Sequence, residues 1–352
     1  MPPPDGIYKV KWENEELVDT HRIDPFNSTH PRRMMISRFK PILAPLCTKT
    51  CRVSVWPKEL ADLEDAIYEA YYAGTGWPTG IFSSLELQVC CRSIPAPFLT
   101  YPKILFGTGL NTTRLSYAST AQHLASRGYE VIVMDHPYET DLVQFPNGDI
   151  IPGGHVIGDR QNTTSLELGL DIRSADAAFV MDALGIKKTV MIGQSYGGAA
   201  AADILLRDSR VVGGVNLDGA MFGHAVAEGV PHPFVVFGSQ DHNSTSEPTW
   251  RPFFEAMDKK RPNVWDRELS FVGSGHGSFT DMSVVGDISG LRNNTVLVDY
   301  IFGNILGSHA MVVFKEYMDD FIQFALGRSN GPGLLAGPDP RYPDVGFLRA
   351  SH

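Results

Sequence analysis

A serine between glycines carries the most specific chemical signal in the sequence. Residues 193–198 read Gly-Gln-Ser-Tyr-Gly-Gly, which matches the G-x-S-x-G pattern of a nucleophile on a sharp strand-to-helix turn. An apolar run at 190–192 leads into this segment, and small residues at 199–204 lead out of it. The glycines let a strand and a helix approach each other closely. We therefore predict that Ser195 is a nucleophile rather than a bystander in a glycine-rich turn.

A serine hydroxyl is a weak nucleophile and needs a base within hydrogen-bond reach. Of the histidines that follow Ser195, His276 is the one in a loop of small residues directly after an apolar run, at 269–272. A flexible loop at the carboxyl end of a strand suits a side chain that must lean over the nucleophile. We predict that His276 is the general base.

The carboxylate that would orient this base has two candidates. Asp218 ends the apolar run at 211–217, and Asp241 follows the apolar run at 234–237. Either side chain could fix the imidazole tautomer and stabilise the imidazolium. The spacing alone does not decide between them.

Two backbone N–H groups must bind the negative charge that develops on the substrate oxygen. One is predicted at Tyr196, the residue after the nucleophile. The other is predicted at Leu110, which follows Gly-Thr-Gly at 107–109 and the apolar run at 104–106. The glycine pair is too short for the G-x-G-x-x-G fingerprint of a dinucleotide site. We expect no nucleotide cofactor.

Alternating apolar runs and helical patterns must position these residues. From residue 101 onward, short apolar runs alternate with segments of helical spacing, which is typical of βαβ units. The sequence therefore predicts an α/β fold with a mainly parallel central sheet and helices on both faces. The site then belongs at the carboxyl ends of the strands. The expected strands are 104–106, 131–134, 189–192, 211–217, 234–237 and 269–272, and the expected helices are 117–126, 166–184, 199–206 and 309–326.

The whole chain, 1–352, is predicted to form a single domain. Residues 1–100 are expected to contain strands at 7–17 and 32–39, a helix at 60–73 and an insertion at 47–93 held by cysteines. Residues 101–326 are expected to form the catalytic core. Residues 327–352 are rich in glycine and proline and predict a tail that is either an ordered arm or a frayed end.

The four cysteines form two local pairs, Cys47 with Cys51 and Cys90 with Cys91. Adjacent cysteines rarely bond to each other, so we expect disulfides that join the first pair to the second. Four reduced thiols are the alternative. A zinc site is a poorer one, because an adjacent pair does not provide the usual C-x₂-C spacing.

Five Asn-X-Ser/Thr sequons point in the same direction as the cysteines, toward an extracellular protein. The start of the chain lacks the pattern of a signal peptide. We expect a mature secreted protein whose leader is not part of this sequence, with a cytoplasmic protein as the alternative. The sequons are at Asn27, Asn111, Asn162, Asn243 and Asn293.

The formal net charge of −10 argues against a general nucleic-acid-binding protein, because phosphate binding needs clustered Lys and Arg. Strong adsorption to anionic membranes is disfavoured for the same reason. No apolar run approaches the roughly 18 residues of a transmembrane helix, so none is predicted.

Several motifs occur together in a fixed order, and as a set they resemble one family. The chain resembles the platelet-activating factor acetylhydrolase isoform II-like family of α/β-hydrolases, in particular its secreted fungal and actinobacterial members. The resemblance covers roughly residues 6–326. The motifs are RRMMIS at 32–37, FGTGL at 106–110, DHPY at 135–138, GQSYGG at 193–198, NLDG at 216–219 with Met221-Phe222, and HGSFTD at 276–281.

The resemblance implies the α/β-hydrolase fold and a triad of Ser195, Asp218 and His276. In this family the acid lies in the Leu-Asp segment after the strand that follows the nucleophile, which favours Asp218 over Asp241. The resemblance also implies oxyanion donors at Leu110 and Tyr196. It further implies metal-independent hydrolysis of carboxylic esters with short or oxidised acyl groups.

The sequence departs from the family pattern at two positions that line the predicted site. Gln194 stands where family members usually have His, and Thr108 replaces the usual His-Gly or Gly-Gly form of its loop. Neither change removes a member of the triad. Both bear on which substrate the site accepts.

We therefore predict a serine carboxylic-ester hydrolase that acts through an acyl-enzyme on a small-molecule ester with a short acyl group, like an acetylhydrolase or a lipase. One alternative is a hydrolase or lactonase of a fungal secondary metabolite on the same scaffold. Another is a binding protein that kept the fold without catalysis, since fold does not imply function.

Overall fold

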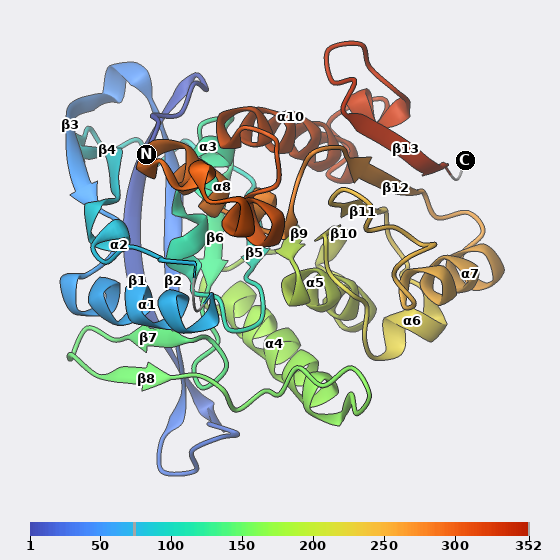
Figure 1. Cartoon of the computed structure of the whole chain (residues 1–352), viewed down its shortest axis with the longest axis horizontal. Helices are drawn as coiled ribbons and strands as arrows, with labels where there is room; N and C mark the ends of the chain where they lie inside the picture. Colours follow the sequence, from blue (N-terminus) through green and yellow to red (C-terminus); the bar gives the residue numbers. More distant parts are fainter. Residues whose placement is uncertain (73–74, 351–352) are drawn as a thin grey trace.

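The computed structural model describes residues 1–72 and 75–350. In these residues the main sheet has nine strands in the order β1-β2-β6-β5-β9-β10-β11-β12-β13 (Figure 1). The strands of this sheet are β1 (Tyr8–Ile23), β2 (Pro31–Leu43), β5 (Lys103–Gly107), β6 (Glu130–Met134), β9 (Thr189–Gln194), β10 (Val211–Leu217), β11 (Phe234–Gly238), β12 (Asp266–Phe271) and β13 (Val345–Ala350).

Six neighbouring strands of this sheet run parallel to one another: β6, β5, β9, β10, β11 and β12. Antiparallel strands complete both edges: β2 and β1 beside β6, and β13 beside β12. The strand order reverses between β5 and β9, because the chain moves outward from β5 to β6 and then returns across the sheet to β9. Such a switch point opens a crevice at the carboxyl ends of the two strands.

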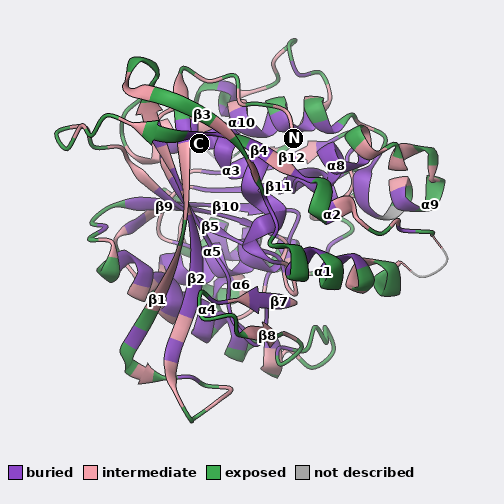
Figure 2. Ribbon diagram, turned by 90° about the vertical axis from the view of Figure 1, so that its left-hand side faces the viewer, coloured by how far each residue is buried: buried purple, intermediate pink, exposed green. Residues whose placement is uncertain are grey.

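The central strands are buried on both faces. Ile104 and Phe106 belong to one apolar cluster, whereas Leu105 between them belongs to another. Val131 and Ile132 divide in the same way. Side chains alternate between the faces of a strand, so a continuous apolar run requires cover on both sides. Figure 2 shows the central strands as a buried layer with exposed residues on the outer helices.

Helices supply this cover from two sides (Figure 1). Residues of α3, α8 and α10 belong to the cluster of Phe106, and residues of α4, α5 and α7 belong to the cluster of Leu105. The predicted α/β fold with helices on both faces is thereby confirmed. The helices are α1 (Lys58–Tyr71), α2 (Ile81–Ser84), α3 (Ala118–Ala125), α4 (Thr164–Ala183), α5 (Tyr196–Arg207), α6 (His224–Glu228), α7 (Trp250–Lys260), α8 (Met282–Ser289), α9 (Thr295–Leu297) and α10 (Gly307–Ala325).

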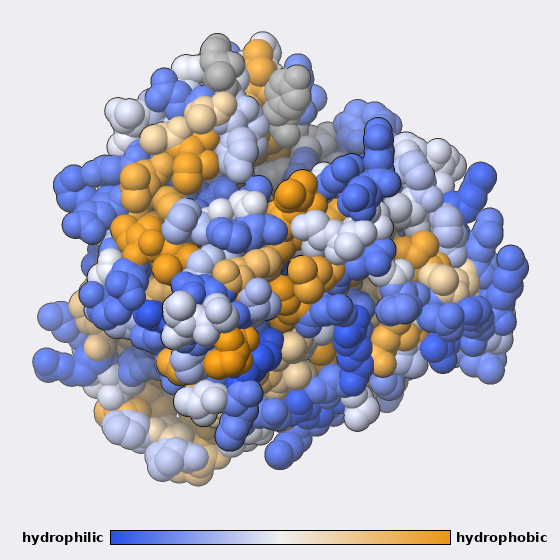
Figure 3. All heavy atoms as spheres, turned by 90° about the horizontal axis from the view of Figure 1, so that it is seen from below, coloured by the Kyte–Doolittle hydropathy of each residue, from blue (hydrophilic) through white to orange (hydrophobic). Residues whose placement is uncertain are grey.

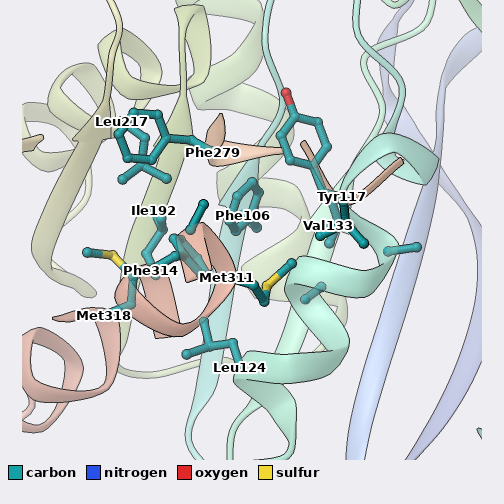
Figure 4. Packing of buried hydrophobic residues seen from close by; sticks show 14 of the residues in the cluster. Phe106, Tyr117, Leu124, Val133, Ile192, Leu217, Phe279, Met311, Phe314 and Met318 are labelled. Carbon is teal, nitrogen blue, oxygen red and sulfur yellow. The ribbon is translucent and has the colours of Figure 1, made fainter. Parts of the chain in front are cut away.

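The cluster beneath the site combines strand residues with α10. Figure 4 shows Phe106, Ile192 and Leu217 packed against Phe314 and Met318. The ring of Tyr117 belongs to the same cluster, but its hydroxyl points out of it (Figure 4). One end of this side chain is thus anchored in the core while the other is free to bond to polar groups.

Two small sheets lie outside the main one. Strand β3 (Cys47–Ser54) pairs with β4 (Glu86–Ser93), and β7 (Leu142–Gln144) pairs with β8 (Ile150–Pro152). Disulfides Cys47–Cys90 and Cys51–Cys91 join β3 to β4, each with Cα atoms 5.8 Å apart. The predicted pairing between the two cysteine groups is confirmed.

The tail is an ordered arm within the residues described. After a short helical turn at Gly333–Ala336, β13 pairs with β12 and extends the main sheet. Residues 351–352 of the predicted tail lie outside the described residues. Residue 73, the expected end of the helix at 60–73, lies outside them as well. The corresponding helix, α1, is described to Tyr71.

No helix in the described ranges is long and apolar enough to cross a membrane. The face in Figure 3 carries separate apolar patches between hydrophilic side chains.

Candidate active site

Ser195 lies on a sharp turn between β9 and α5, at the carboxyl end of the parallel strands. Its backbone has φ 54° and ψ −125°, a conformation that is strained for a residue with a side chain. The turn is held because the Ser195 N–H donates to the carbonyl of Leu217 at 2.8 Å and the Gly198 N–H donates to the carbonyl of Ser195 at 2.8 Å. The side chain of Ser195 lines two adjoining cavities.

Glycine is required on either side of the turn because backbone segments nearly touch there. A Cβ atom on Gly193 would lie 1.9 Å from the carbonyl oxygen of Gly197. A Cβ atom on Gly197 would lie 2.3 Å from the carbonyl oxygen of Gly107. These are contacts with backbone, which no side-chain rotation relieves. The glycines therefore bring Ser195 against the loop that follows β5.

His276 begins the turn after β12 and faces the same two cavities as Ser195. Its Nδ1 lies 2.6 Å from Oδ2 of Asp218. Because an ionised carboxylate only accepts hydrogen bonds, Nδ1 carries the proton and Nε2 of the neutral ring is left as the acceptor. This is the tautomer that can take a proton from a serine hydroxyl.

The Nε2 atom of His276 points toward Gln194 in this structure, with 3.2 Å between Nε2 of His276 and the amide nitrogen of Gln194. No described residue forms a hydrogen bond with Ser195 Oγ. Ser195 and His276 therefore line the same two cavities without a hydrogen bond between them. Hydrogen bonds of this kind often tighten only when a substrate is bound.

Asp218 is buried at the end of β10, with 2% of its surface exposed. Burial by itself would raise the pKa of Asp218, but hydrogen bonds from His242 and His276 hold it well below its usual range. Its Oδ1 also accepts the backbone N–H of Ser239 at 2.6 Å. A carboxylate so held is ionised near neutral pH.

Asp241, the other candidate acid, is turned away from this group. It is exposed after β11, and its side chain accepts a hydrogen bond from Gln240 at 3.3 Å. Within the residues described, it has no contact with His276. The geometry therefore pairs His276 with Asp218.

Leu110 and Tyr196 both line the smaller of the cavities beside Ser195. Tyr196 is the first residue of α5, so its N–H has no carbonyl partner within the helix. No described residue accepts a hydrogen bond from the N–H of Leu110 or Tyr196. Both groups are therefore available to an oxygen of a bound molecule.

A buried arginine holds the loop that carries Leu110. Arg173 of α4 donates to the carbonyl oxygens of Thr108 at 2.5 Å and Gly109 at 3.0 Å. Glu139 binds its guanidinium from the other side, and Arg173 is fully buried. Arg173 also lies over the ring of Tyr196, 4.6 Å from its centroid. One side chain thus contacts both segments that supply the free N–H groups.

The larger cavity beside Ser195 has a volume of about 360 Å³, and we call it the tyrosine cavity. Asp141 in its wall accepts a hydrogen bond from Tyr71 at 3.2 Å. Burial raises the pKa of Asp141 to about 7. Further residues of the wall are Tyr68, Tyr72, Asn111, Met282 and Ile301.

The smaller cavity, which we call the Phe222 cavity, has a volume of about 260 Å³. It has both apolar and charged walls, and Ser195, Asp218 and His276 all line it. Its other residues include Leu166, Ala220 and Phe222 on the apolar side and Arg160, His242 and Glu247 on the charged side.

A cavity of about 780 Å³ lies elsewhere, around Lys103, Glu130 and Lys187. These residues are at or near the amino ends of β5, β6 and β9, opposite the end that carries Ser195. Although this cavity is larger, it contains none of the residues singled out from the sequence. No cluster of side chains suited to a metal ion occurs in the described part of the chain.

Comparison with known proteins identifies the family. No family model matches the chain. A probable 1-alkyl-2-acetylglycerophosphocholine esterase of Arthroderma benhamiae is 38% identical over an alignment of 368 positions, which covers 99% of this chain and 93% of that protein. The chain belongs to the platelet-activating factor acetylhydrolase isoform II-like family.

More distant relatives agree with this membership. Platelet-activating factor acetylhydrolase of Cavia porcellus is 24% identical, over 77% of this chain and 71% of that protein. Among solved structures, a ferulic acid esterase from Streptomyces cinnamoneus matches with a TM-score of 0.77 and 25% identity over 98% of each chain. These proteins are named as esterases and acetylhydrolases, in agreement with the prediction of a carboxylic ester hydrolase.

Gln194, at which the sequence departs from the family pattern, forms hydrogen bonds with two separate segments of the site. Its Oε1 accepts a hydrogen bond from the hydroxyl of Tyr117 at 2.8 Å, and that hydroxyl accepts the N–H of Gly109 at 2.9 Å. Its amide nitrogen donates to the carbonyl of His276 at 3.2 Å. Gln194 therefore connects the loop after β5 with the loop that carries His276.

Sequence reasoning missed Arg173, Glu247 and the hydrogen bond of His242 in this family member. Arg173 left a weak signal, since it falls on the buried face of α4 with Leu166, Leu170 and Ala177. A charged residue on an apolar helical stripe predicts a buried partner. His242 follows β11 rather than β12, and chain order alone gave it no role.

Proposed function

We propose that this chain is a serine carboxylic-ester hydrolase that works through an acyl-enzyme. His276 removes the proton from Ser195 Oγ, which attacks the ester carbonyl. The N–H groups of Leu110 and Tyr196 bind the oxyanion, and Asp218 stabilises the imidazolium. His276 then gives the proton to the leaving alcohol and later activates the water that releases the acid.

The observation that carries this proposal is the shared geometry of Ser195 and His276. The serine is on a strained turn, two free backbone N–H groups flank it, and His276 bonded to Asp218 opens into the same cavities. For the reaction, His276 must exchange its contact with Gln194 for one with Ser195 Oγ. This is a rotation of one partly exposed side chain.

The two cavities support a short-chain substrate. We propose that the Phe222 cavity, at about 260 Å³ and beside both oxyanion donors, takes the acyl group. The tyrosine cavity, at about 360 Å³, would then take the alcohol. A small acyl cavity lined partly by charged residues disfavours long apolar chains, because burying apolar groups against charges leaves the charges poorly solvated.

We also propose that residues 1–352 act as one domain in a secreted protein. Strands from both ends of the chain join the same sheet, and two disulfides are present. The sequons at Asn162 and Asn293 are exposed and suit glycans, whereas Asn111 lines the tyrosine cavity. Glycans at the first two positions and none at Asn111 are expected on natively expressed protein, as peptide mass mapping would establish.

The test is hydrolysis of p-nitrophenyl esters from acetate to decanoate, with wild type beside Ser195→Ala. Activity should be highest at short chains and fall at least about 10³-fold in the variant, because the nucleophile is lost. A fluorophosphonate probe should label Ser195, as mass spectrometry of the tryptic peptide would show. His276→Gln should abolish turnover, whereas His309→Gln should not, although His309 also bonds to a carboxylate, Asp344, at 2.7 Å.

Other outcomes favour other functions. Labelling at Ser195 without turnover of any simple ester would point to a hydrolase or lactonase of a particular metabolite. Neither labelling nor turnover in folded protein would refute the proposal and favour a binding protein. Equal activity of wild type and Ser195→Ala would refute the assigned nucleophile.

A further inference from the structure

A second histidine bonds to the carboxylate of Asp218. Nδ1 of His242 lies 2.7 Å from Oδ1 of Asp218, and Nε2 lies 3.2 Å from Oε2 of Glu247. Ionised carboxylates only accept hydrogen bonds, so both ring nitrogens of His242 must donate. An imidazole with two N–H groups is a cation. The geometry therefore makes His242 an imidazolium.

Both carboxylates have reason to be ionised. Glu247 is buried, yet it accepts hydrogen bonds from Arg160 at 2.5 Å and from the hydroxyl of Thr249 at 2.9 Å. Burial raises the pKa of Glu247, but its hydrogen bonds outweigh burial and bring the pKa to about 2. Burial likewise lowers the pKa of His242, but Asp218 and Glu247 outweigh it and raise that pKa to about 9.

We propose that His242 is a positioning residue for the reaction at Ser195: as an imidazolium it fixes the carboxylate of Asp218 and lets His276 work as a base at lower pH than Asp218 alone would allow. This inference rests on the proposed esterase function. It assigns to the second histidine a role that acts entirely through Asp218.

Orientation is the first part of this role. Each oxygen of Asp218 binds one imidazole, His276 at Oδ2 and His242 at Oδ1. A rotation of the carboxylate would break both bonds at once. His242 is itself held by Glu247 and by the ring of Trp250, whose centroid lies 4.5 Å away. Asp218 is therefore fixed from the side opposite to the base.

Charge is the second part. A lone aspartate favours the protonated form of its histidine. It therefore raises the pH at which that histidine becomes able to accept a proton. The positive charge of His242 offsets part of the charge of Asp218. The acid limb of the rate profile should then lie at lower pH. The charged or titratable groups around His242 are Asp218 after β10, Glu247 of its own loop, Arg160 from the loop before α4, His276 through Asp218, and its chain neighbour Asp241.

The experiment compares His242→Gln, which removes the charge, with His242→Lys, which keeps it. The pH profile of kcat/KM is measured on a neutral short-chain p-nitrophenyl ester. In His242→Gln the acid limb should move to higher pH by about 0.5 to 1 unit. In His242→Lys it should stay within about 0.2 units of wild type. His309→Gln serves as the matched control and should leave the profile unchanged.

Other results would overturn the inference. An acid limb that stays in place in folded His242→Gln, or that moves equally in both variants, would make His242 merely structural. A loss of kcat without a shift of the acid limb would likewise make His242 merely structural.

A second measurement does not depend on turnover or on the stability of the His242 variants. Nitrogen NMR of histidine-labelled Ser195→Ala protein should show His242 protonated on both ring nitrogens at pH 7.5. A neutral His242 at that pH would overturn the inference. Absence of ester turnover and of fluorophosphonate labelling in wild type would instead refute the proposed function, so the two failures can be told apart.

Discussion

Replacing Asp218 by asparagine tests the candidate site most directly. The amide has the shape of the carboxylate, but it carries no charge and its nitrogen cannot accept a hydrogen bond. Asp218 accepts three N–H groups, from Ser239 at 2.6 Å, His242 at 2.7 Å and His276 at 2.6 Å. With its nitrogen at the Oδ1 position, asparagine would leave both Ser239 and His242 without an acceptor; with its nitrogen at the Oδ2 position, it would turn its own N–H toward His276.

The expected size of the effect follows from the charge that the variant loses. In the proposed mechanism His276 becomes an imidazolium in the transition state, hydrogen-bonded to Asp218. Two unit charges about 4 Å apart interact by about 4 kcal/mol at an effective dielectric constant near 20. Since about 1.4 kcal/mol corresponds to tenfold in rate, Asp218→Asn should lower kcat by about 10³-fold. KM should change far less, because Asp218 is buried and acts through His276 in this mechanism.

The assay is turnover of a short-chain p-nitrophenyl ester at saturating concentration, with Asp241→Asn as the matched control. Asp241 is exposed and does not contact His276, so its variant should stay within about twofold of wild type. Circular dichroism must show both variants folded. A folded Asp218→Asn that keeps more than a tenth of wild-type kcat would refute the assignment. A large loss in Asp241→Asn instead would transfer the role to Asp241.

Three further predictions concern the loop, the cysteines and the cavity. Arg173→Lys should lower kcat about 10- to 100-fold in the same ester assay with little change in KM. Lysine cannot bind the carbonyls of both Thr108 and Gly109 in the loop that carries Leu110. Removing both Cys47–Cys90 and Cys51–Cys91 should cost about 3 to 4 kcal/mol in urea unfolding, whereas removing one should cost much less, since the other closes almost the same loop. Asp141→Asn should raise Tm relative to wild type above pH 7 but not near pH 4. Burial raises the pKa of Asp141 to about 7, so the native state loses stability as pH rises from about 4 to 7, while the unfolded chain ionises freely.

Each of these predictions has an outcome that contradicts it. For the loop, Arg207→Lys is the control, because Arg207 bonds to Asp171 on the surface, and equal kcat in both lysine variants would remove any special role of Arg173. For the cysteines, a single removal as costly as the double one would contradict the loop argument. For the cavity, parallel Tm curves of wild type and Asp141→Asn from pH 4 to 8 would show that Asp141 titrates normally.

The sequence predicted the features that depend on local pattern. Continuous apolar runs such as 131–134 require burial on both faces, and they became the parallel strands. The glycines around Ser195 predicted a close-packed turn because few other residues fit one. The cysteine pairing followed from the adjacency of Cys90 and Cys91. In each case neighbouring residues carried the constraint.

The features that could not be predicted depend on contacts between distant segments. Arg173 bonds to Thr108, 65 residues away, and His242 bonds to Asp218, 24 residues away. No spacing rule connects such positions, because the sheet order brings them together. Strand β13 escaped prediction for a related reason: an edge strand pairs on one side only, so its sequence needs no continuous apolar run.

The hydrogen bonds of Arg173 and those of His242 act on different parts of the proposed reaction, and this leads to a last prediction. Arg173 holds the loop of Leu110, one of the two proposed oxyanion donors, through Thr108 and Gly109, whereas His242 holds Asp218. The networks share no hydrogen-bond partner, so the loss of kcat in Arg173→Lys with His242→Gln should equal the product of the single losses within about twofold. Groups that act as one unit would instead give a double loss little larger than either single one. Kinetics of the two single variants and the double variant on one ester decide between these cases. A strongly non-multiplicative result would mean that displacing the oxyanion loop also displaces the base, and Gln194, which bonds to Tyr117 and His276, would be the residue that transmits it.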